Sequence, residues 1–576
     1  MLIVPLAALW LPGLLWLLLL DLHRGKTLLE IIALSLGISL SILSLSLTCL
    51  SFLGIRPGAL IIVLSLAGLV AALGLRVRGL GINIRLINMS RAGYVPLLLL
   101  LLHMFLWFAY FWKYPVFPSS QSPDPLRHAT FVQEVVDGRG VDAMREARYG
   151  LGLHFIVGFI IQNSSDQLLI ILRYFVAFLE SMTVLLVYFV AALLSTRRDA
   201  ALTSLIYAVA VPIGVVHLIG AGTYANILAD FLCLTAIYFM QQSLQSRRLK
   251  DLATVALVGG GLLLSHPFVS IIFLTFAWLF STVVMLHYRS TLRGYCYSVF
   301  SLTLAAALGV SAFPGFLERA LSLLARYLSS PTPIAVICQV WLQNMGFFLG
   351  LPGMLLLVFA LLAYSWKVNW DPNIHSTPEK EVLIFFMFGW FLYASALTIQ
   401  GGEIWRLVLH SLLPGVFILA TGLSGPVWVL CGRVSKSVSS RSFTRALRSS
   451  LLLLVFLAIL VGSCATYVLN ELQGPGQRER QMAVYESMRW AQQNTRSNDL
   501  FASVNLAEYR YLPIVANRRL ERNYEVPSDR MRDVLRLTKA LYIVIPTEEL
   551  RIDLSMWACT VAFSNDYVTI LKLNAL

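Results

Sequence analysis

The chain has 576 residues, of which 58% are hydrophobic and 13% charged, and its mean hydropathy is +0.75. This composition excludes a soluble globular protein, and recurring apolar runs of about 18 or more residues predict a polytopic α-helical membrane protein. The formal net charge is +14, but Lys and Arg gather in short loops between apolar runs. That pattern is typical of cytoplasmic loops and does not indicate a nucleic-acid partner.

The apolar runs predict about fourteen transmembrane helices. In chain order they lie near 2–20, 28–52, 59–75, 92–112, 168–194, 200–218, 224–241, 252–266, 268–286, 297–314, 349–366, 382–399, 405–423 and 450–468. With these spans, five loops rich in Lys and Arg all fall on one side of the membrane, which is the cytoplasmic side. The loop 113–167 and everything after residue 468 are therefore expected on the extracytoplasmic face of the plasma membrane.

The chain divides into three parts on this reading. Residues 1–91 hold additional N-terminal transmembrane helices, and residues 92–468 form a transmembrane core with a large first extracytoplasmic loop, 113–167. Residues 469–576 are predicted to form a small extracytoplasmic α/β domain, because QRERQMAVYESMRWAQQNT and PSDRMRDVLRLTKA have helical periodicity while LFASV, LYIVI and YVTILKL are typical of strands.

The first long polar run, SSQSPDPLRHATFVQEVVDGRG, belongs to the loop 113–167. Asp124 is a good N-cap, Pro125 suits the first helical position and Gly138 suits a C-terminal stop, so these residues can be explained by helix capping alone. Asp124 and His128 are also four residues apart and share one helix face. A carboxylate placed there could deprotonate a hydroxyl or hold a divalent metal. The downstream acids are expected to be solvated loop charges: Glu134, Asp137, Asp142 and Glu146.

The segment YGLGLHFIVGFIIQ follows this polar run and is too short for a confident span, so a re-entrant or interfacial helix is expected. It carries His154. Arg173 lies near the outer end of the span 168–194, facing the loop that carries Asp124. Ionisable groups inside a membrane need partners, and an internal ion pair explains Arg173, Glu180 and Asp230 as well as catalysis does.

A late span begins with IQGGEIWRLVLH, which places Glu403, Arg406 and His410 at its outer mouth. Arg406 could snorkel to the membrane surface, or its guanidinium could clamp a lipid phosphate by a bidentate contact. His266, in LLLSHPFVS, lies near an outer span end. A single histidine of this kind is more often a packing residue than a ligand.

Together these segments resemble the GT-C superfamily of integral-membrane glycosyltransferases, which use polyprenyl-phosphate-linked sugars, in its prokaryotic type. The resemblance covers most of the chain from about residue 92 and rests on the acidic first loop with ARYGLGLHFIVGFI, on LIGAGTYANILADFLCL, on LLLSHPFVSIIFL and on IWRLVLHSLLPGVFILATGL. The first loop lacks an Asp-x-Asp or Asp-Glu pair, so metal dependence stays open. The tail lacks a WWDYG-type signature, which argues against an oligosaccharyltransferase acting on Asn.

The resemblance implies an inverting glycosyltransferase of the cell envelope, with a sugar donor carried by polyprenyl phosphate and a glycan, lipid or protein acceptor. It implies that Asp124 is the catalytic acid residue, with assistance from His128. Arg406, with His410 or His266, would bind the donor phosphate, and Glu403, His154 and Arg173 are further cavity candidates. Two alternatives are a multi-pass lipid or solute transporter, or flippase, and a non-catalytic scaffold that binds through the tail.

Overall fold

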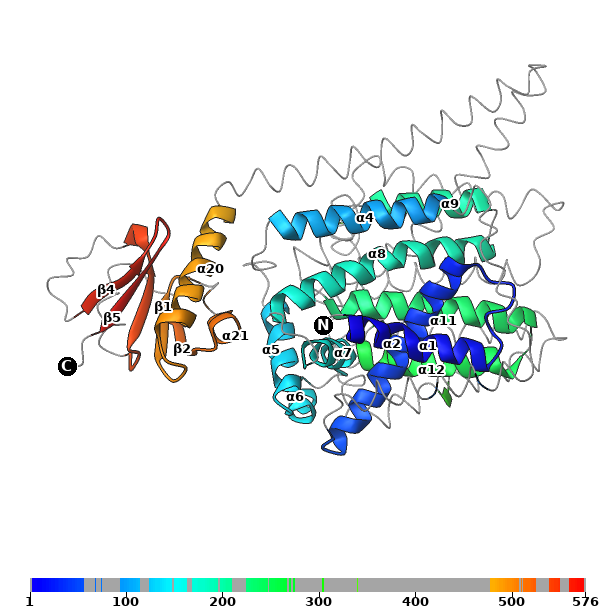
Figure 1. Ribbon diagram of the computed structural model, residues 1–576, viewed down its shortest axis with the longest axis horizontal. Helices are drawn as coiled ribbons and strands as arrows, with labels where there is room; N and C mark the ends of the chain where they lie inside the picture. Colours follow the sequence, from blue (N-terminus) through cyan, green and yellow to red (C-terminus); the bar gives the residue numbers. More distant parts are fainter. Residues whose placement is uncertain are drawn as a thin grey trace, which may run out of the picture.

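The structure is a computed structural model, in which an apolar helical bundle carries a small C-terminal α/β domain beyond α5 at one end (Figure 1). It describes, apart from a few isolated positions, residues 3–55, 94–113, 124–147, 150–162, 168–194, 197–209, 224–246, 248–266, 477–506, 511–524, 538–549 and 559–573.

The bundle contains seven described helices that coincide with predicted spans. Three of the described helices are long and apolar enough to cross a membrane: Leu28–Phe52, Leu168–Leu193 and Tyr224–Ser243. The seven helices are α1 (Ile3–Leu19), α2 (Leu28–Phe52), α4 (Tyr94–Lys113), α8 (Leu168–Leu194), α9 (Arg197–Val209), α11 (Tyr224–Ser246) and α12 (Leu249–Ser265). The other predicted spans lie wholly or largely outside the described residues, so the count of fourteen is not confirmed, and the proposed domain boundaries stay a prediction.

The N-terminal helices pack inside this bundle. Thr27 and Glu30 form a capping box at the start of α2, which satisfies two backbone N–H groups of its first turn. α2 then contacts α1, α12, α8 and α11. A Cβ on Gly13 of α1 would lie 1.9 Å from the Ser35 carbonyl oxygen. Only glycine therefore permits this close crossing of α1 and α2.

The loop 113–167 folds into three helices that cover one end of the bundle. They are α5 (Asp124–Val136), α6 (Gly140–Ala147) and α7 (Gly152–Gln162). α5 ends at Val136, and Gly138, two residues later, has a φ of +85°, which fits the predicted C-terminal stop. α7 has 11 residues and is almost entirely buried against α5, α2 and α8. Since such a helix rises only about 16 Å, it does not cross the roughly 30 Å hydrocarbon core.

The C-terminal domain is a five-stranded mixed sheet with helix α20 (Gln477–Asn494) against one face. The strand order is β2-β1-β3-β5-β4: β1 pairs in parallel with β2 and β3, and β5 pairs antiparallel with β3 and β4. The predicted strands correspond to β1 (Leu500–Val504), β3 (Tyr542–Pro546) and β5 (Val568–Leu573). Two strands were not predicted, β2 (Arg519–Tyr524) and β4 (Cys559–Ser564), while the predicted helix PSDRMRDVLRLTKA lies largely outside the described residues.

A short helix of this domain, α21 (Leu512–Ala516), joins the domain to the bundle. Ile514 packs against the core of the bundle and against that of the C-terminal domain. Leu126 of α5 and Leu169 of α8 pack against the domain core from the bundle side. The C-terminal domain thus lies at the same end of the bundle as α5, α6 and α7, as the predicted topology requires.

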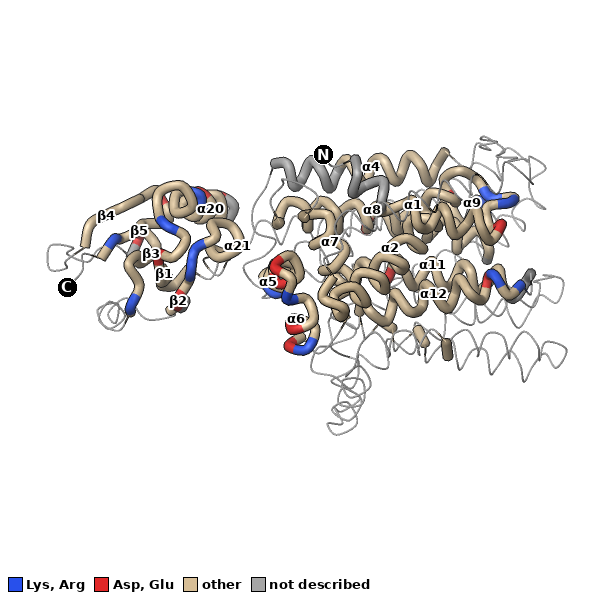
Figure 2. The backbone as a smooth tube through the Cα atoms, turned by 60° about the horizontal axis from the view of Figure 1, so that its bottom comes forward, with Lys and Arg blue, Asp and Glu red and all other residues tan. Residues whose placement is uncertain are grey.

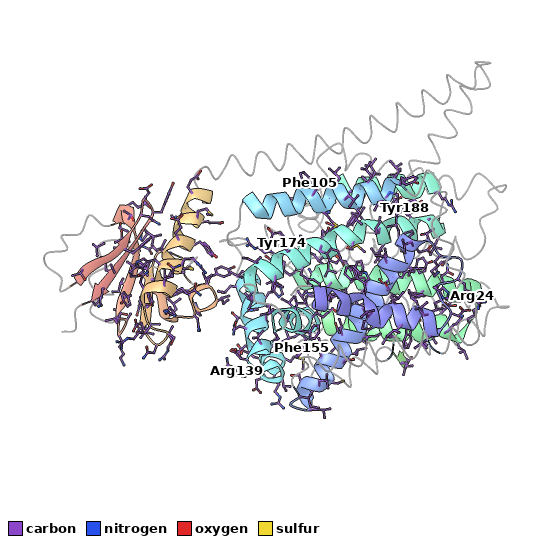
Figure 3. The ribbon with its side chains drawn as sticks, in the orientation of Figure 1. Arg24, Phe105, Arg139, Phe155, Tyr174 and Tyr188 are labelled. Carbon is purple, nitrogen blue, oxygen red and sulfur yellow. The ribbon has the colours of Figure 1, made fainter. Side chains whose placement is uncertain are left out.

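The opposite end of the bundle carries the loop 20–27 and the first residues of α9 and α12. Figure 2 shows Lys and Arg at these helix starts, far from the C-terminal domain. In Figure 3, Arg24 marks this end, while Phe155 on α7 and Tyr174 on α8 lie toward the other. The described loops at this end therefore lie at the opposite end of the bundle from α5, α6 and α7 (Figures 1 and 2).

Candidate active site

Two histidines from different helices are joined at the covered end of the bundle. Nδ1 of His128, on α5, lies 2.8 Å from Nε2 of His154, on α7. The two rings are nearly parallel, with centroids 5.0 Å apart and an interplanar angle of 27°. His154 has no exposed surface and His128 is 6% exposed. The fold therefore brings together two histidines that are 26 residues apart in the sequence.

Aromatic rings surround this histidine pair. Tyr224, the first residue of α11, is fully buried, with its ring 5.6 Å from that of His128. Phe131 of α5 meets His154 edge-on, with centroids 5.5 Å apart. The sequence analysis missed Tyr224, although the motif LIGAGTYANILADFLCL contains it. A tyrosine at the start of a span, directly after a Gly-rich loop, is the signal that could have found it.

A buried arginine lies beside these rings. Arg173 of α8 is 2% exposed, and its Nε donates a hydrogen bond to the Leu169 carbonyl at 3.1 Å. The Tyr224 hydroxyl is in electrostatic range of Arg173 and of Tyr511, which directly precedes α21. Arg173 therefore lies near Tyr224 at the end of the bundle covered by α5 and α7, and the C-terminal domain contributes Tyr511 to the same region.

Glycines hold α7 in position. A Cβ on Gly150 would lie 2.4 Å from the Leu264 carbonyl oxygen, so the chain before α7 runs directly against the last turn of α12. His266 ends α12, and its backbone N–H donates to the Leu262 carbonyl at 3.2 Å. His266 is thus a capping residue at the same end of the bundle. The Val269 N–H donates to Nδ1 of the His266 ring at 3.5 Å.

The other predicted site residues divide into two groups. α5 begins at Asp124, and His128 follows one turn later, so the helix places both positions on one face. Glu403, Arg406 and His410 lie outside the described residues, as does any distance between Asp124 and Arg406. The downstream acids are on helices or at their ends, and three make surface ion pairs with Arg139 or Arg145: Glu134, Asp137 and Asp142.

The acids inside the bundle have a different neighbour from the one expected. Glu180 accepts a hydrogen bond from the Tyr207 hydroxyl at 3.0 Å, and Asp230 lies in electrostatic range of both. Arg173 instead interacts with the ring cluster around Tyr224. Among the described residues, no group of three or more His, Cys, Asp or Glu side chains could hold a metal ion.

Burial controls the protonation of His154. It lowers the pKa of His154 well below 6.5, and the neighbouring His128 lowers this pKa further, while the Leu151 carbonyl opposes the shift. His154 is therefore neutral at physiological pH. A neutral imidazole has one N–H donor and one nitrogen lone pair. In the hydrogen bond between the two rings, one histidine therefore donates and the other accepts.

No protein-family model and no curated protein sequence matches the chain. Several solved structures, however, have a similar fold. The oligosaccharyltransferase of Archaeoglobus fulgidus in the apo form is 13% identical, with a TM-score of 0.51 over 80% of this chain and 70% of that one. ArnT from Cupriavidus metallidurans, bound to undecaprenyl phosphate, is 14% identical, with a TM-score of 0.51 over 84% of this chain and 98% of that one.

At identities of 13% and 14% the similarity shows the fold alone: the chain shares the overall fold of these two solved structures. This agrees with the resemblance that its motifs suggested. Neither neighbour is a transporter, so the comparison does not favour the transporter alternative.

Proposed function

We propose that this protein transfers a sugar from a polyprenyl-phosphate-linked donor to an acceptor at the extracytoplasmic face of the plasma membrane. One observation carries the proposal: a chain with the GT-C fold gathers His128, His154, Tyr224 and Arg173 at the end of the bundle covered by α5 and α7. Buried polar groups are costly at membrane depth and mark functional sites. The acceptor is a glycan, a lipid or a protein.

Asp124 and His128 act on the acceptor in this reaction. Asp124 orients the acceptor hydroxyl or takes its proton, and His128, one helical turn later on α5, assists. The acceptor oxygen then attacks the anomeric carbon of the sugar from the face opposite the lipid phosphate, so the configuration inverts. A positioned general base of this kind contributes about 10²- to 10⁴-fold to the rate.

Cationic side chains assist the departure of the lipid. When the bond between the anomeric carbon and the phosphate oxygen breaks, the electron pair stays on that oxygen and negative charge develops there. Arg406, with His410 or His266, is proposed to bind this phosphate, and Arg173 adds a buried positive charge at the same end of the bundle. Donors placed where charge develops stabilise the transition state. Because the donor resides in the membrane, the reaction needs no nucleotide site.

The test uses the full chain in lipid nanodiscs with a panel of radiolabelled undecaprenyl-phosphate-linked pentoses and hexoses. Extracted envelope glycans, lipids and peptides serve as acceptors, and release of undecaprenyl phosphate is the readout. We expect transfer from at least one donor and its loss by about a hundredfold or more in Asp124→Asn. Asp142→Asn is the matched control, because Asp142 is an exposed carboxylate on α6.

Two results would contradict the proposal. If Asp124→Asn transfers sugar as fast as Asp142→Asn, Asp124 is only a helix cap. If proteoliposomes move the undecaprenyl-phosphate-linked sugar between leaflets and release no undecaprenyl phosphate, the transporter alternative is correct.

A further inference from the structure

The direction of the hydrogen bond between His128 and His154 decides which nitrogen of His128 can take a proton. The bond joins Nδ1 of His128 to Nε2 of His154. If His128 donates from Nδ1, the lone pair of its neutral ring is on Nε2. If His154 donates, the lone pair is on Nδ1 and is already used by the bond. The tautomer of a histidine is set by the partner of its other nitrogen.

The surroundings of His154 favour one of these directions. His154 is fully buried on α7, and burial together with His128 keeps it neutral by lowering its pKa, so it holds a single proton. The Leu151 backbone opposes the lowering of this pKa, which is the effect of a carbonyl that attracts the ring proton. Since Nε2 faces His128, the proton attracted by Leu151 is on Nδ1, and Nε2 has the lone pair.

We propose that His154 is a positioning residue, whose Nε2 accepts a hydrogen bond from Nδ1–H of His128 and so fixes the lone pair of His128 on Nε2. This inference rests on the proposed function and adds a role for His154 to it. The arrangement follows the general rule that a proton acceptor is oriented by a third group on its other side. Here that group is a neutral imidazole on a different helix, held by the glycine contacts between α7 and α12.

The proton balance of the transfer follows from this tautomer. Asp124 orients the acceptor hydroxyl, and its proton moves to Nε2 of His128 as the acceptor oxygen bonds to the anomeric carbon. The bond from the anomeric carbon to the phosphate oxygen breaks, and its electron pair leaves with the lipid phosphate. His128 becomes an imidazolium that still donates Nδ1–H to His154. The Tyr224 ring is tilted by 31° to that of His128, with centroids 5.6 Å apart, while Nδ1 of His128 faces His154.

The first part of the test compares two substitutions of similar size. In His154→Gln the side-chain carbonyl can still accept from Nδ1–H of His128, whereas in His154→Leu no acceptor is left. We expect kcat of sugar transfer to fall about a hundredfold in His154→Leu and to be largely retained in His154→Gln, because a general base contributes about 10²-fold or more. KM for the lipid-linked donor should be similar in both. Equal loss in the two variants would reduce His154 to a packing residue and overturn the inference.

The second part reads the tautomer without any substrate. The full chain labelled with ¹⁵N-histidine is studied by solid-state NMR in lipid, and the His128 signal is identified by its absence in His128→Gln. We expect a protonated Nδ1 and an unprotonated Nε2 in the wild type and in His154→Gln. A protonated Nε2 on His128 would overturn the inference even if transfer is observed. Conversely, failure of the transfer assay would refute the proposed function and leave this tautomer measurement valid.

Discussion

The two ends of the helical bundle both bury polar groups, but they do so in different ways. At the end opposite the C-terminal domain, the Lys26 ammonium donates to the Tyr238 hydroxyl at 2.7 Å, lies 4.7 Å from the centroid of its ring and is 4.0 Å from Glu30. The Tyr238 hydroxyl in turn bonds to Glu30. At the other end lie the stacked rings of His128 and His154, with Tyr224 tilted beside them.

The two ends therefore have different roles: the Lys26 network stabilises the fold, and the histidine pair is suited to proton transfer. The Lys26 cluster joins the loop between α1 and α2 to α11, and it balances positive with negative charge, which is what buried charges require. This network holds the start of α2 against α11. The histidine pair joins α5 to α7 by one hydrogen bond whose direction depends on protonation, which makes it suited to moving a proton. Each end can therefore be altered separately, and the following predictions test that separation.

The first prediction removes the Lys26 side chain from the polar network at the end opposite the C-terminal domain. Lys26→Met removes a side chain that is only 10% exposed and leaves Glu30 and Tyr238 without it. We expect the free energy of unfolding to fall by about 3 kcal/mol, because removing one partner of a buried pair leaves the other charge without compensation. The activity per folded molecule should not change. Thermal and denaturant unfolding in detergent, with sugar transfer measured on the folded fraction, checks both.

Arg24→Met is the matched control for this prediction. Arg24 pairs with Asp21 at 2.6 Å, but its side chain is 62% exposed. A surface ion pair contributes about 0–1 kcal/mol, so this variant should be close to the wild type in stability. Equal losses in Lys26→Met and Arg24→Met would show that the Lys26 network does not fasten the bundle. A loss of transfer in folded Lys26→Met would show that the two ends are coupled.

The second prediction shifts α7, which carries His154, without removing any aromatic or histidine ring. A Cβ on Gly150 would meet the backbone of α12 at Leu264, which cannot move as a side chain can, whereas a Cβ on Gly158 would meet the Val135 side chain at 2.8 Å. Gly150→Ala should therefore cost about 2 kcal/mol of stability, within the range for overpacking, and lower transfer by shifting His154. Gly158→Ala should cost less. The reverse order would mean that the segment before α7 does not position the site.

The edge of the C-terminal sheet shows where the sequence was insufficient. The three inner strands, β1, β3 and β5, are apolar and were predicted, while the missed strands, β2 and β4, are the two edges. β2 has the sequence RLERNY, and Thr560 and Val561 of β4 are exposed. Edge strands need no continuous apolar pattern and often carry charges that oppose aggregation, so hydrophobic periodicity does not detect them.

In the candidate site, too, the sequence predicted local features but not contacts between distant segments. The helical spacing of Asp124 and His128 is a local property, and the sequence predicted the helix that contains both. The pairing of His128 with His154, and the approach of Tyr224 from α11, are contacts across the fold, which spacing within one helix cannot reveal. The sequence predicted His154 as a cavity candidate but not its partner, because a partner 26 residues away has no periodic signature.

The last prediction uses pH to sharpen the comparison of the two ends. Burial lowers the pKa of His154 well below its usual 6.5, so below pH 6.5 the unfolded chain binds a proton that the folded chain does not. Folding stability should thus be fully present above pH 6.5 and fall by about 1.4 kcal/mol per pH unit as the pH drops toward the lowered value. His154→Gln has no such group, so its stability should fall less steeply between pH 6.5 and 5. Thermal unfolding of both proteins across this range measures the difference. Parallel curves would mean that His154 takes up its proton equally in the folded and unfolded chains, in conflict with a neutral His154 beside His128.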